Sequence, residues 1–274
     1  MTPTSSTGSS VDSQAPLSAP VPGRSPALPA RDAVLVLALA TLPLLAVSGG
    51  GFVADDFFFV TVLERTTTPL FQYLTGAVLA MREVPTTFYR PLAMASLLAE
   101  IRAFGSDPWA LHLGNLVLHA AAALAVWGIA RRLVEGPHAR VASIVAALAW
   151  AWFPRRVETV AWISCRPDLL ATALATVGLW MWVEGARGHR TPLRAAGVLA
   201  WGLALLAKES VVALPLALVA WPALEGRVPA GDVLARFTRT AARSVALWPF
   251  VLMGAVYFAL RRAATGALVG GYGT

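Results

Sequence analysis

The sequence predicts an all-α protein, a polytopic transmembrane helical bundle of about seven spans with a long outer loop. Of its 274 residues, 57% are hydrophobic and 14% are charged. Soluble domains carry about 25% charged and 45–50% apolar residues. The mean hydropathy is +0.64, and the apolar residues gather in runs that approach the roughly 17–25 residues a span requires. Composition and run length together indicate a membrane protein.

Residues 1–30 are rich in serine, proline and small side chains. Such a segment cannot bury a core, so we expect a disordered cytoplasmic tail ahead of a membrane domain at 31–274. Arg24 and Arg31 come late, and no small-residue cleavage site cleanly follows the apolar stretch. A secretory signal peptide is therefore not expected.

Seven apolar runs are candidate spans, and several are shorter than the nominal length. We expect the short ones to be buried among other helices or lengthened by their flanks. In order, the runs cover about 33–53, 111–130, 141–153, 169–183, 193–207, 210–224 and 244–260.

The segment between the first two runs, about 54–110, is too long to be a simple connector. It contains two shorter apolar stretches, about 70–81 and 91–104. Neither is long enough to span, so both are expected to be interfacial helices on the outer membrane surface.

The basic residues favour a cytoplasmic N-terminus, because short cytoplasmic loops collect lysine and arginine. Ten of them fall in loops on the N-terminal side: Arg131, Arg132, Arg140, Arg187, Arg190, Arg194, Arg227, Arg236, Arg239 and Arg243. Six fall on the opposite side: Arg155, Arg156, Arg166, Lys208, Arg261 and Arg262. We therefore expect a multi-pass protein of the cytoplasmic membrane.

Composition excludes several function classes. The net charge is +7, but no basic run with interleaved aromatic residues supports a nucleic-acid partner. The one cysteine, Cys165, rules out an intramolecular disulfide and a cysteine-based metal site.

An acid pair, Asp55 and Asp56, directly follows the first apolar run. Acids in this place either cap a helix end facing water or provide a general base. The catalytic interpretation gains from the basic loops expected on the same face, because a carboxylate opposite cations suits a base next to an anion-binding pocket.

Other charges interrupt apolar sequence, which is costly at membrane depth. One interpretation is that Lys208 and Glu209 form an ion pair between two short helices. The other is that Lys208 reaches a bound phosphate. The loop PRRVETVAWISCRPDLL, 154–170, includes Arg156, Glu158, Arg166 and Asp168. It either meets lipid headgroups or forms an interfacial site for an amphiphilic substrate.

Two further polar groups allow alternatives. His112, Asn115 and His119 share one helix face, and we favour interhelical hydrogen bonds over metal binding because metal-type spacing is absent. Arg90 precedes Pro91 at the start of the second interfacial helix, where it either binds phosphate or anchors the helix to headgroups.

Five motifs occur in order along the chain: DDFFFV, FYRPLAMASL, HLGNLVLH, VETVAWISCRPDLLATAL and LLAKESVVALPLAL. Together they resemble the membrane domain of C-superfamily (GT-C) glycosyltransferases, over about residues 33–273. The sequence is most similar to O-mannosyltransferase-like proteins that often carry tetratricopeptide repeats after the membrane part.

The resemblance implies that a mannose-like hexose moves from a polyprenyl-phosphate donor to a hydroxyl of a protein or glycan acceptor on the outer face. It makes Asp55 or Asp56 the general base of an inverting displacement, and it makes Arg90, Arg166 and Lys208 the cations that hold the donor phosphate. Glu158, Asp168, Glu209 and Arg156 are implied to support these groups. No cofactor is expected, and a divalent metal, although chemically possible, is not favoured.

The sequence departs from the family pattern in three respects. The acid pair is Asp-Asp where some relatives have Asp-Glu, and the segment FPRRVET lacks a histidine that relatives often place there. No repeat domain follows, and the sequence stops at GGYGT, which predicts a C-terminally truncated enzyme. A lipid or solute transporter and a non-catalytic membrane scaffold are the alternative functions.

Overall fold

The computed structural model describes residues 29–67, 69, 72–75, 88–218 and 247–269. Within these ranges every regular element is helical, which confirms the all-α prediction. The expected tail at 1–30 lies outside the described residues except for its last two positions.

Three segments are long and apolar enough to cross a membrane. The first is Ala30–Gly49, formed by α1 (Ala30–Thr41) and the 3₁₀-helix η1 (Leu42–Gly49). The second is α5 (Pro108–Leu133). The third is Ile163–Arg187, which joins the 3₁₀ turn η2 (Ile163–Cys165) to α8 (Arg166–Arg187). These match the first, second and fourth predicted spans.

The other predicted spans form shorter elements, so the total of seven remains a prediction. They are α6 (Ala139–Ala151), α9 (Thr191–Ala207), the 3₁₀-helix η3 (Glu209–Leu216) and α12 (Trp248–Thr265). Positions 219–224 of the sixth run lie outside the described residues.

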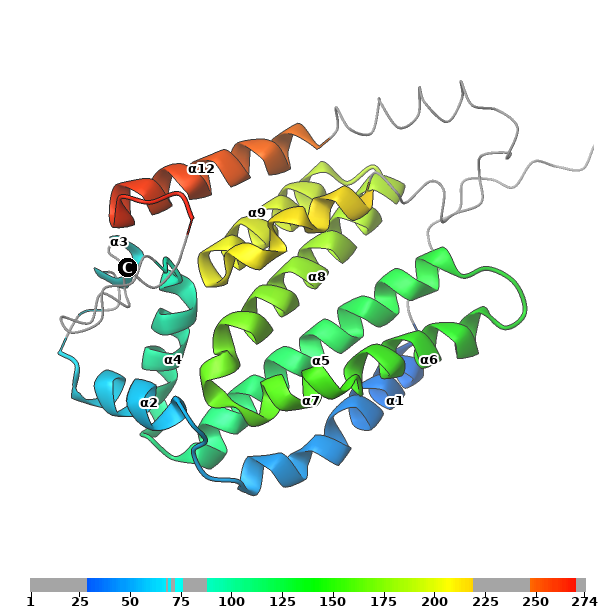
Figure 1. Ribbon diagram of the computed structural model, residues 1–274. Helices are drawn as coiled ribbons and strands as arrows, with labels where there is room; N and C mark the ends of the chain where they lie inside the picture. Colours follow the sequence, from blue (N-terminus) through cyan, green and yellow to red (C-terminus); the bar gives the residue numbers. More distant parts are fainter. Residues whose placement is uncertain (1–28, 68, 70–71, 76–87, 219–246, 270–274) are drawn as a thin grey trace, which may run out of the picture.

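Helices α5, α8 and α9 lie side by side in the middle of the bundle (Figure 1). Helices α1 and α6 pack against α5 on one side, and α12 packs against α9 on the other. The outer-loop elements α2 (Asp56–Arg65), α3 (Gln72–Thr75) and α4 (Pro91–Phe104) gather at one end. We call this the α2–α4 end.

Prolines and glycines in the sequence set several helix boundaries. Pro91, Pro108 and Pro192 lie in the first turns of α4, α5 and α9, where a missing N–H costs nothing. Gly105 ends α4 with φ +76°, and Gly266 ends α12 with φ +73°. The predicted interfacial stretch 91–104 is thus a helix with the predicted bounds, whereas only 72–75 of the stretch 70–81 are described as helical.

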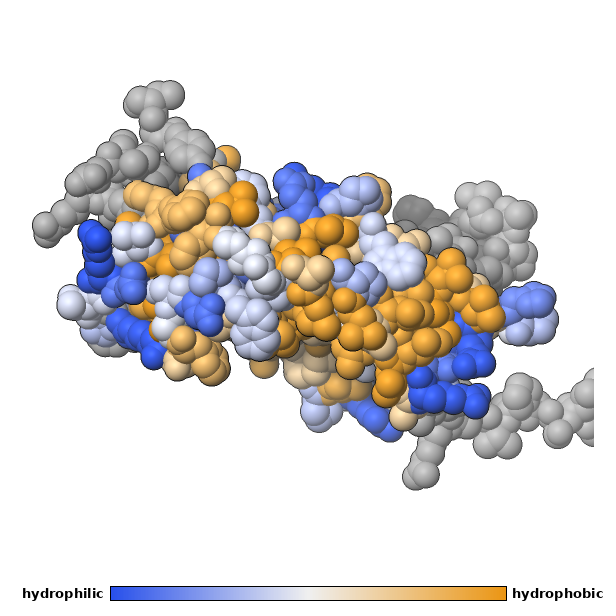
Figure 2. Space-filling view, turned by 90° about the horizontal axis from the view of Figure 1, so that it is seen from below, coloured by the Kyte–Doolittle hydropathy of each residue, from blue (hydrophilic) through white to orange (hydrophobic). Residues whose placement is uncertain are grey.

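The side of the molecule seen in Figure 2 carries a broad apolar surface with hydrophilic patches toward both ends. Helices α1 and α6 expose large apolar side chains, among them Val34, Leu37, Val141 and Val145. A contiguous exposed apolar surface on a helical bundle is expected where lipid replaces water as the solvent.

Helices α8 and α9 approach each other closely at two glycines. A Cβ atom on Gly178 would lie 2.6 Å from the carbonyl oxygen of Gly197, and one on Gly197 would lie 2.6 Å from that of Gly178. Small residues at such a contact allow helices to pack closely where no hydrophobic force drives them together.

We expect Gly178→Ala and Gly197→Ala each to destabilise the protein by about 1–3 kcal/mol, because the added methyl group must push the two backbones apart. Thermal denaturation in detergent measures the effect. Gly49→Ala is the control, since nothing lies within 4 Å of its Cβ position. Equal melting temperatures for all three variants would contradict the close approach.

Candidate active site

Asp55 and Asp56 begin α2, but their environments differ completely. The Asp56 side chain is fully buried. One of its carboxylate oxygens accepts from the backbone N–H groups of Val53 (3.0 Å) and Ile163 (3.3 Å). The other accepts from the N–H and the hydroxyl of Ser164, at 2.7 and 2.5 Å. Asp55 is exposed, and its carboxylate forms no hydrogen bond or ion pair with the described residues.

The predicted loop 154–170 is in fact structured. It forms α7 (Pro154–Ala161), the turn η2 and the start of α8. Pro154 and Pro167 both lie in first turns, so each proline restarts a helix after the chain changes direction. Glu158 forms an exposed ion pair with Arg155 at 3.2 Å, on the surface of α7.

Polar residues of α5 hold this segment from inside the bundle. Asn115 is fully buried and donates to the carbonyl oxygens of Val160 (3.4 Å) and Trp162 (3.2 Å). His112 contacts the carbonyl oxygen of Gly51 at 3.4 Å. These bonds agree with the expectation that the polar face of α5 makes hydrogen bonds between segments. His119 instead stacks on Trp150 with ring centroids 5.6 Å apart.

Arg166 does not face an open site. It is 4% exposed, and its guanidinium forms an ion pair with Glu100 of α4 and donates to the carbonyl oxygen of Leu111 at 3.1 Å. The Glu100 carboxylate lies directly against Gly114 of α5, where any side chain would collide with it. Burial raises the pKa of Glu100, and the neighbouring Arg166 opposes this rise. The pair thus joins α4, α5 and α8.

Lys208 lies in the break between α9 and η3, as predicted. Its ammonium group bonds both carboxylate oxygens of Asp168, at 2.7 and 2.6 Å. Both side chains remain partly exposed. Arg156 of α7 stacks over Trp150, with its guanidinium carbon 5.0 Å from the ring centre, and it interacts electrostatically with Asp168. Burial lowers the pKa of Arg156, and Asp168 opposes this.

Arg90 belongs to a second charged group, which we call the Glu209 cluster: Tyr89, Arg90, Glu209, Tyr257 and Arg261. The two carboxylate oxygens of Glu209 face Arg90 at 3.4 Å and Arg261 at 3.8 Å. Burial acts against the charged form of Glu209. Its own backbone N–H and the two arginines outweigh burial, so the pKa of Glu209 lies below its usual value.

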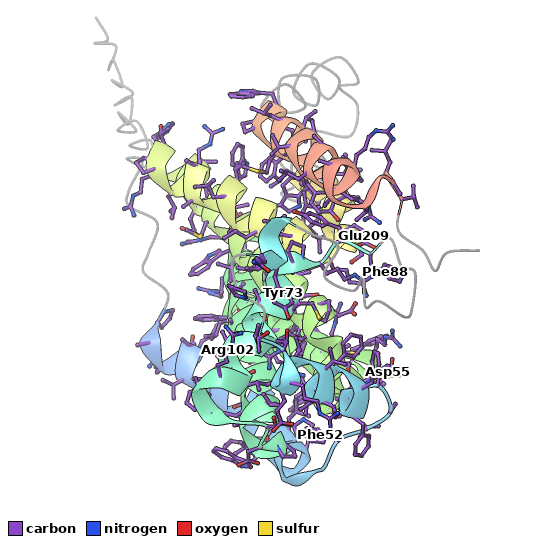
Figure 3. The ribbon with its side chains drawn as sticks, turned by 90° about the vertical axis from the view of Figure 1, so that its left-hand side faces the viewer. Phe52, Asp55, Tyr73, Phe88, Arg102 and Glu209 are labelled. Carbon is purple, nitrogen blue, oxygen red and sulfur yellow. The ribbon has the colours of Figure 1, made fainter. Side chains whose placement is uncertain are left out.

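The acid pair and the charged groups described above all lie at the α2–α4 end, and a chain of contacts connects each group to the next. Asp56 binds Ser164, two residues before Arg166; Asp168 binds Lys208; and Glu209 binds Arg90. Figure 3 views the bundle from this end, with Asp55 beside α2 and Glu209 close to Phe88. The Arg90 guanidinium stacks over that Phe88 ring, 4.5 Å from its centre. The structure therefore brings the predicted acids and cations to one end of the bundle.

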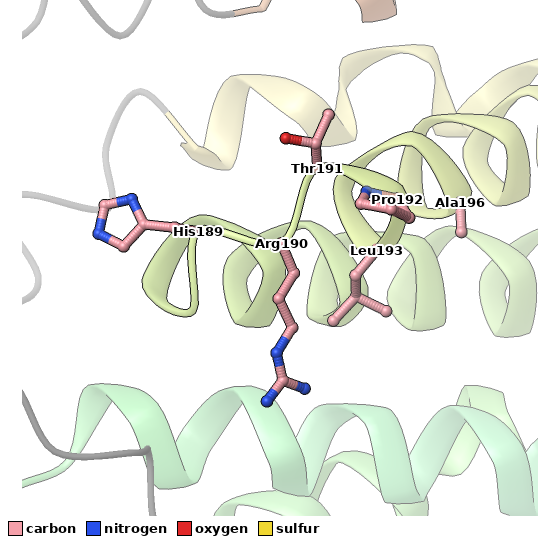
Figure 4. Close-up of a pocket in the computed structure, with 6 residues that line it drawn as sticks. All are labelled: His189, Arg190, Thr191, Pro192, Leu193 and Ala196. Atoms are coloured by element: carbon pink, nitrogen blue, oxygen red, sulfur yellow. The ribbon is translucent and has the colours of Figure 1, made fainter.

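The opposite end contains a different set of charges. Arg132 pairs with Glu184, and Arg140 pairs with the buried Asp32 at 2.7 Å. A shallow, mostly apolar pocket lies at the turn between α8 and α9, where His189, Arg190 and Thr191 line it together with Pro192, Leu193 and Ala196 (Figure 4). None of the predicted site residues lies there.

Metal-ligand groups do not converge in the described part of the chain: no three His, Cys, Asp or Glu side chains lie together in a metal-binding arrangement. The carboxylates of Asp56, Glu100 and Asp168 are instead each occupied by hydrogen-bond donors. The charged groups described at this end are carboxylates together with guanidinium and ammonium groups.

Comparison with known families gives a match over residues 90–253, to the dolichyl-phosphate-mannose-protein mannosyltransferases. This range contains α4, α7, α8, α9 and η3, the elements that supply most of the site. The chain belongs to this mannosyltransferase family. Searches of curated proteins and of solved structures gave no match.

Membership confirms the resemblance to GT-C enzymes, and the apolar helices agree with it. The chain is therefore a membrane glycosyltransferase of the GT-C type, a family that implies a lipid-linked sugar donor and a protein acceptor. Asp55 and Asp56 lie before the matched range, and Arg261 lies after it.

Sequence reasoning missed Glu100 and Arg261 as members of the charged groups. Arg261 is almost fully buried near the end of a largely apolar helix, beside the exposed Arg262, and a buried ionisable residue in such a helix is itself a signal of function. Glu100 carried no comparable signal, because its partner Arg166 is distant in sequence.

We predict that the buried Asp56 contributes to the stability of the fold and that the exposed Asp55 does not. Asp56→Asn should lower the free energy of unfolding by about 1–3 kcal/mol for each buried donor left unsatisfied, since the amide NH₂ cannot accept. Asp55→Asn should leave it unchanged. Thermal denaturation of the two variants measures the difference, and equal destabilisation would contradict the assigned hydrogen bonds.

The Glu100–Arg166 pair should matter far more than a surface pair. Arg166→Met leaves a buried carboxylate unpaired and is expected to cost about 3–5 kcal/mol. Arg155→Met, which breaks the exposed pair with Glu158, should cost about 1 kcal/mol or less. Chemical denaturation of both variants provides the comparison, and a small effect of Arg166→Met would show that the pair does not join the helices.

Proposed function

We propose that this chain moves a mannose-like hexose from a polyprenyl-phosphate donor to the hydroxyl of a protein acceptor at the α2–α4 end. The observation that carries this proposal is the contrast within the acid pair. Asp56 is buried and fully hydrogen-bonded, and it thereby holds an exposed, uncommitted Asp55 next to the segment that carries the cations.

Asp55 is the proposed general base. Its carboxylate is open to solvent and to an incoming acceptor, whereas both oxygens of Asp56 already accept two hydrogen bonds each. A base must lie within hydrogen-bonding reach of the proton it removes. In this proposal Asp56 is a positioning residue: it fixes the turn that begins α2 and so sets the direction of Asp55.

The donor phosphate requires cations, and Arg90 and Lys208 are the best placed. Both are partly exposed, and each has a carboxylate partner that can exchange for a phosphate oxygen. Arg166 was predicted for the same task, but its burial beneath α4 suits a structural role instead. Asp168 then holds Lys208 directly, and Arg156 acts on Lys208 through its electrostatic interaction with Asp168.

The proposed reaction is a single displacement. The acceptor oxygen forms a bond to the anomeric carbon while its proton passes to Asp55, and the bond from that carbon to the phosphate oxygen breaks. The polyprenyl phosphate leaves with the electron pair, and the cations neutralise its growing charge. The mechanism requires no general acid, since phosphate is already a good leaving group, and it uses no metal.

The location of the reaction is part of the proposal. The α2–α4 end is placed on the outer face of a cytoplasmic membrane, because Arg131, Arg132, Arg187, Arg190 and Arg194 lie toward the other end of the helices. A lipid-linked donor would then be used at the outer surface.

The test is transfer of radiolabelled mannose from a polyprenyl-phosphate donor in proteoliposomes. Asp55→Asn should reduce the rate by about 10²–10⁴-fold, the usual contribution of a general base. Glu64→Gln is the matched control, because Glu64 is an exposed acid on the same helix. Wild-type turnover that Asp55→Asn leaves unchanged would refute the base. Absence of turnover by the wild-type chain would favour the scaffold interpretation.

A further inference from the structure

Residues 150–156 connect the end of α6 to the start of α7 and contain three aromatic side chains followed by two arginines. Trp152 and Phe153 are exposed. Earlier in α6, Val141 and Val145 are exposed as well, so apolar side chains on the outside of the bundle lead along this helix to the arginines. Exposed aromatic and basic residues at the end of an apolar helix are typical of the depth at which lipid headgroups begin.

The two arginines of α7 differ in their partners. Arg155 forms the exposed ion pair with Glu158. Arg156 forms no hydrogen bond or ion pair with the residues that the structure describes. The carboxylate that acts on it electrostatically is Asp168, and both oxygens of Asp168 are already bonded by Lys208. A guanidinium group has five N–H donors, and those of Arg156 are not used within the described part of the chain.

Arg156 is nevertheless held in place before any ligand arrives. Its guanidinium carbon lies 5.0 Å from the centre of the Trp150 ring, and the same ring stacks on the fully buried His119 of α5. A cation–π contact uses the flat face of a guanidinium group and leaves the N–H donors at its edge unused. Burial lowers the pKa of Arg156, because water is partly excluded from the charge. A partly dehydrated cation with unused donors is stabilised by an anion that supplies acceptors.

The Trp152 side chain is fixed as well, by an irregularity in the first span. Pro43 has no N–H group, so it cannot donate to the carbonyl oxygen of Leu39 four residues earlier. The indole N–H of Trp152 donates to that oxygen instead, at 3.1 Å. This bond holds the indole against the junction of α1 and η1, while Trp152 stays 48% exposed. The exposed part of the ring is a fixed apolar surface at the end of α6.

We propose that Arg156 and Trp152 form a binding site for an anionic phospholipid of the surrounding membrane, such as phosphatidylglycerol. The phosphodiester oxygens accept hydrogen bonds from the Arg156 guanidinium, and an acyl chain lies against Trp152 and the exposed side of α6. Helices α6 and α7 follow one another along the side of the bundle where α1 lies (Figure 1). The site is separate from the acid pair and from the two cations assigned to the donor, and it does not rest on the proposed function.

The occupant follows from the combination of charge and apolar surface. A free phosphate would use Arg156 alone, and an acidic peptide would leave the apolar side of α6 uncovered. A zwitterionic phospholipid carries its own cation beside the phosphate, and that cation weakens the attraction to a guanidinium group. An anionic phospholipid supplies both the unbalanced negative charge and the acyl chain, so it matches both parts of the site.

The first test measures the affinity of the purified full chain, in a neutral detergent, for short-chain phosphatidylglycerol, from the ligand-induced rise in melting temperature. Arg156→Gln should weaken binding about tenfold, through the loss of a charge-assisted contact. Arg155→Gln is the matched control, because Arg155 is adjacent in sequence and already paired with Glu158; it should bind as the wild type does. Equal weakening by the two variants would indicate a diffuse attraction to basic residues and would overturn the site.

The apolar part of the site is tested by two exposed tryptophans. Trp152→Ala should weaken phosphatidylglycerol binding about tenfold, because the acyl chain loses an apolar contact. Trp109→Ala is its control, since Trp109 is also exposed but lies at the start of α5; it should have no effect. Equal binding by both variants and the wild type would overturn the inference. The tryptophan pair also keeps the site testable if Arg156→Gln does not fold.

Competition experiments identify the occupant. Phosphatidylcholine of the same chain length should bind about tenfold more weakly than phosphatidylglycerol, and equal binding of the two lipids would contradict recognition by charge. Displacement of phosphatidylglycerol by inorganic phosphate at the same concentration would overturn the lipid as occupant. A polyprenyl phosphate that binds more tightly than phosphatidylglycerol, and that Arg156→Gln weakens, would assign Arg156 to the donor instead.

The lipid site and the proposed function fail separately. Asp55→Asn should lose sugar transfer and bind phosphatidylglycerol as the wild type does. Loss of lipid binding in Asp55→Asn would place the lipid at the acid pair and overturn the site at Arg156.

Discussion

The arrangement of the α2–α4 end depends on the buried carboxylate of Asp56. It accepts four hydrogen bonds, three from backbone N–H groups and one from the Ser164 hydroxyl. Those donors come from the linker after η1 and from η2, two segments more than a hundred residues apart. A buried carboxylate is tolerated only when such bonds replace its hydration. Asp56 therefore fixes the start of α2 on the segment that leads into α8.

The consequences extend along the chain from this point. Once η2 is fixed, the first turn of α8 places Arg166 beneath α4 and Asp168 beside Lys208. Glu100 and Gly114 then determine how closely α4 approaches α5. Lys208 is followed directly by Glu209, which meets Arg90 at the start of α4 and Arg261 on α12. Four segments that are distant in sequence thus contribute charged groups to one end of the bundle.

Many of the helices and several of the charged site residues could be predicted from the sequence, for physical reasons that differ from residue to residue. Long apolar runs indicated the spans at α1–η1, α5 and α8, and Pro91 marked the start of α4. The acid pair and the isolated charges were visible because ions are rare in apolar sequence. The roles of Asp55 and Asp56 were not separable, since both precede the same helix. Their difference depends on η2, whose backbone N–H groups carry no sequence signal. The burial of Arg166 was hidden for the same reason, because Glu100 reaches it only through the fold.

The central claim is that Asp55, the free carboxylate of the acid pair, acts as a general base on the acceptor, so that the sugar is transferred in a single displacement. The anomeric configuration of the product tests this most directly, because a base acting on the acceptor gives inversion, whereas a carboxylate that attacks the anomeric carbon gives a covalent intermediate and retention. NMR of the mannosylated acceptor, made from a donor of known configuration, gives the answer. The account predicts inversion at the anomeric carbon. Retention would require a carboxylate that attacks the anomeric carbon and would contradict the role of Asp55 as a general base.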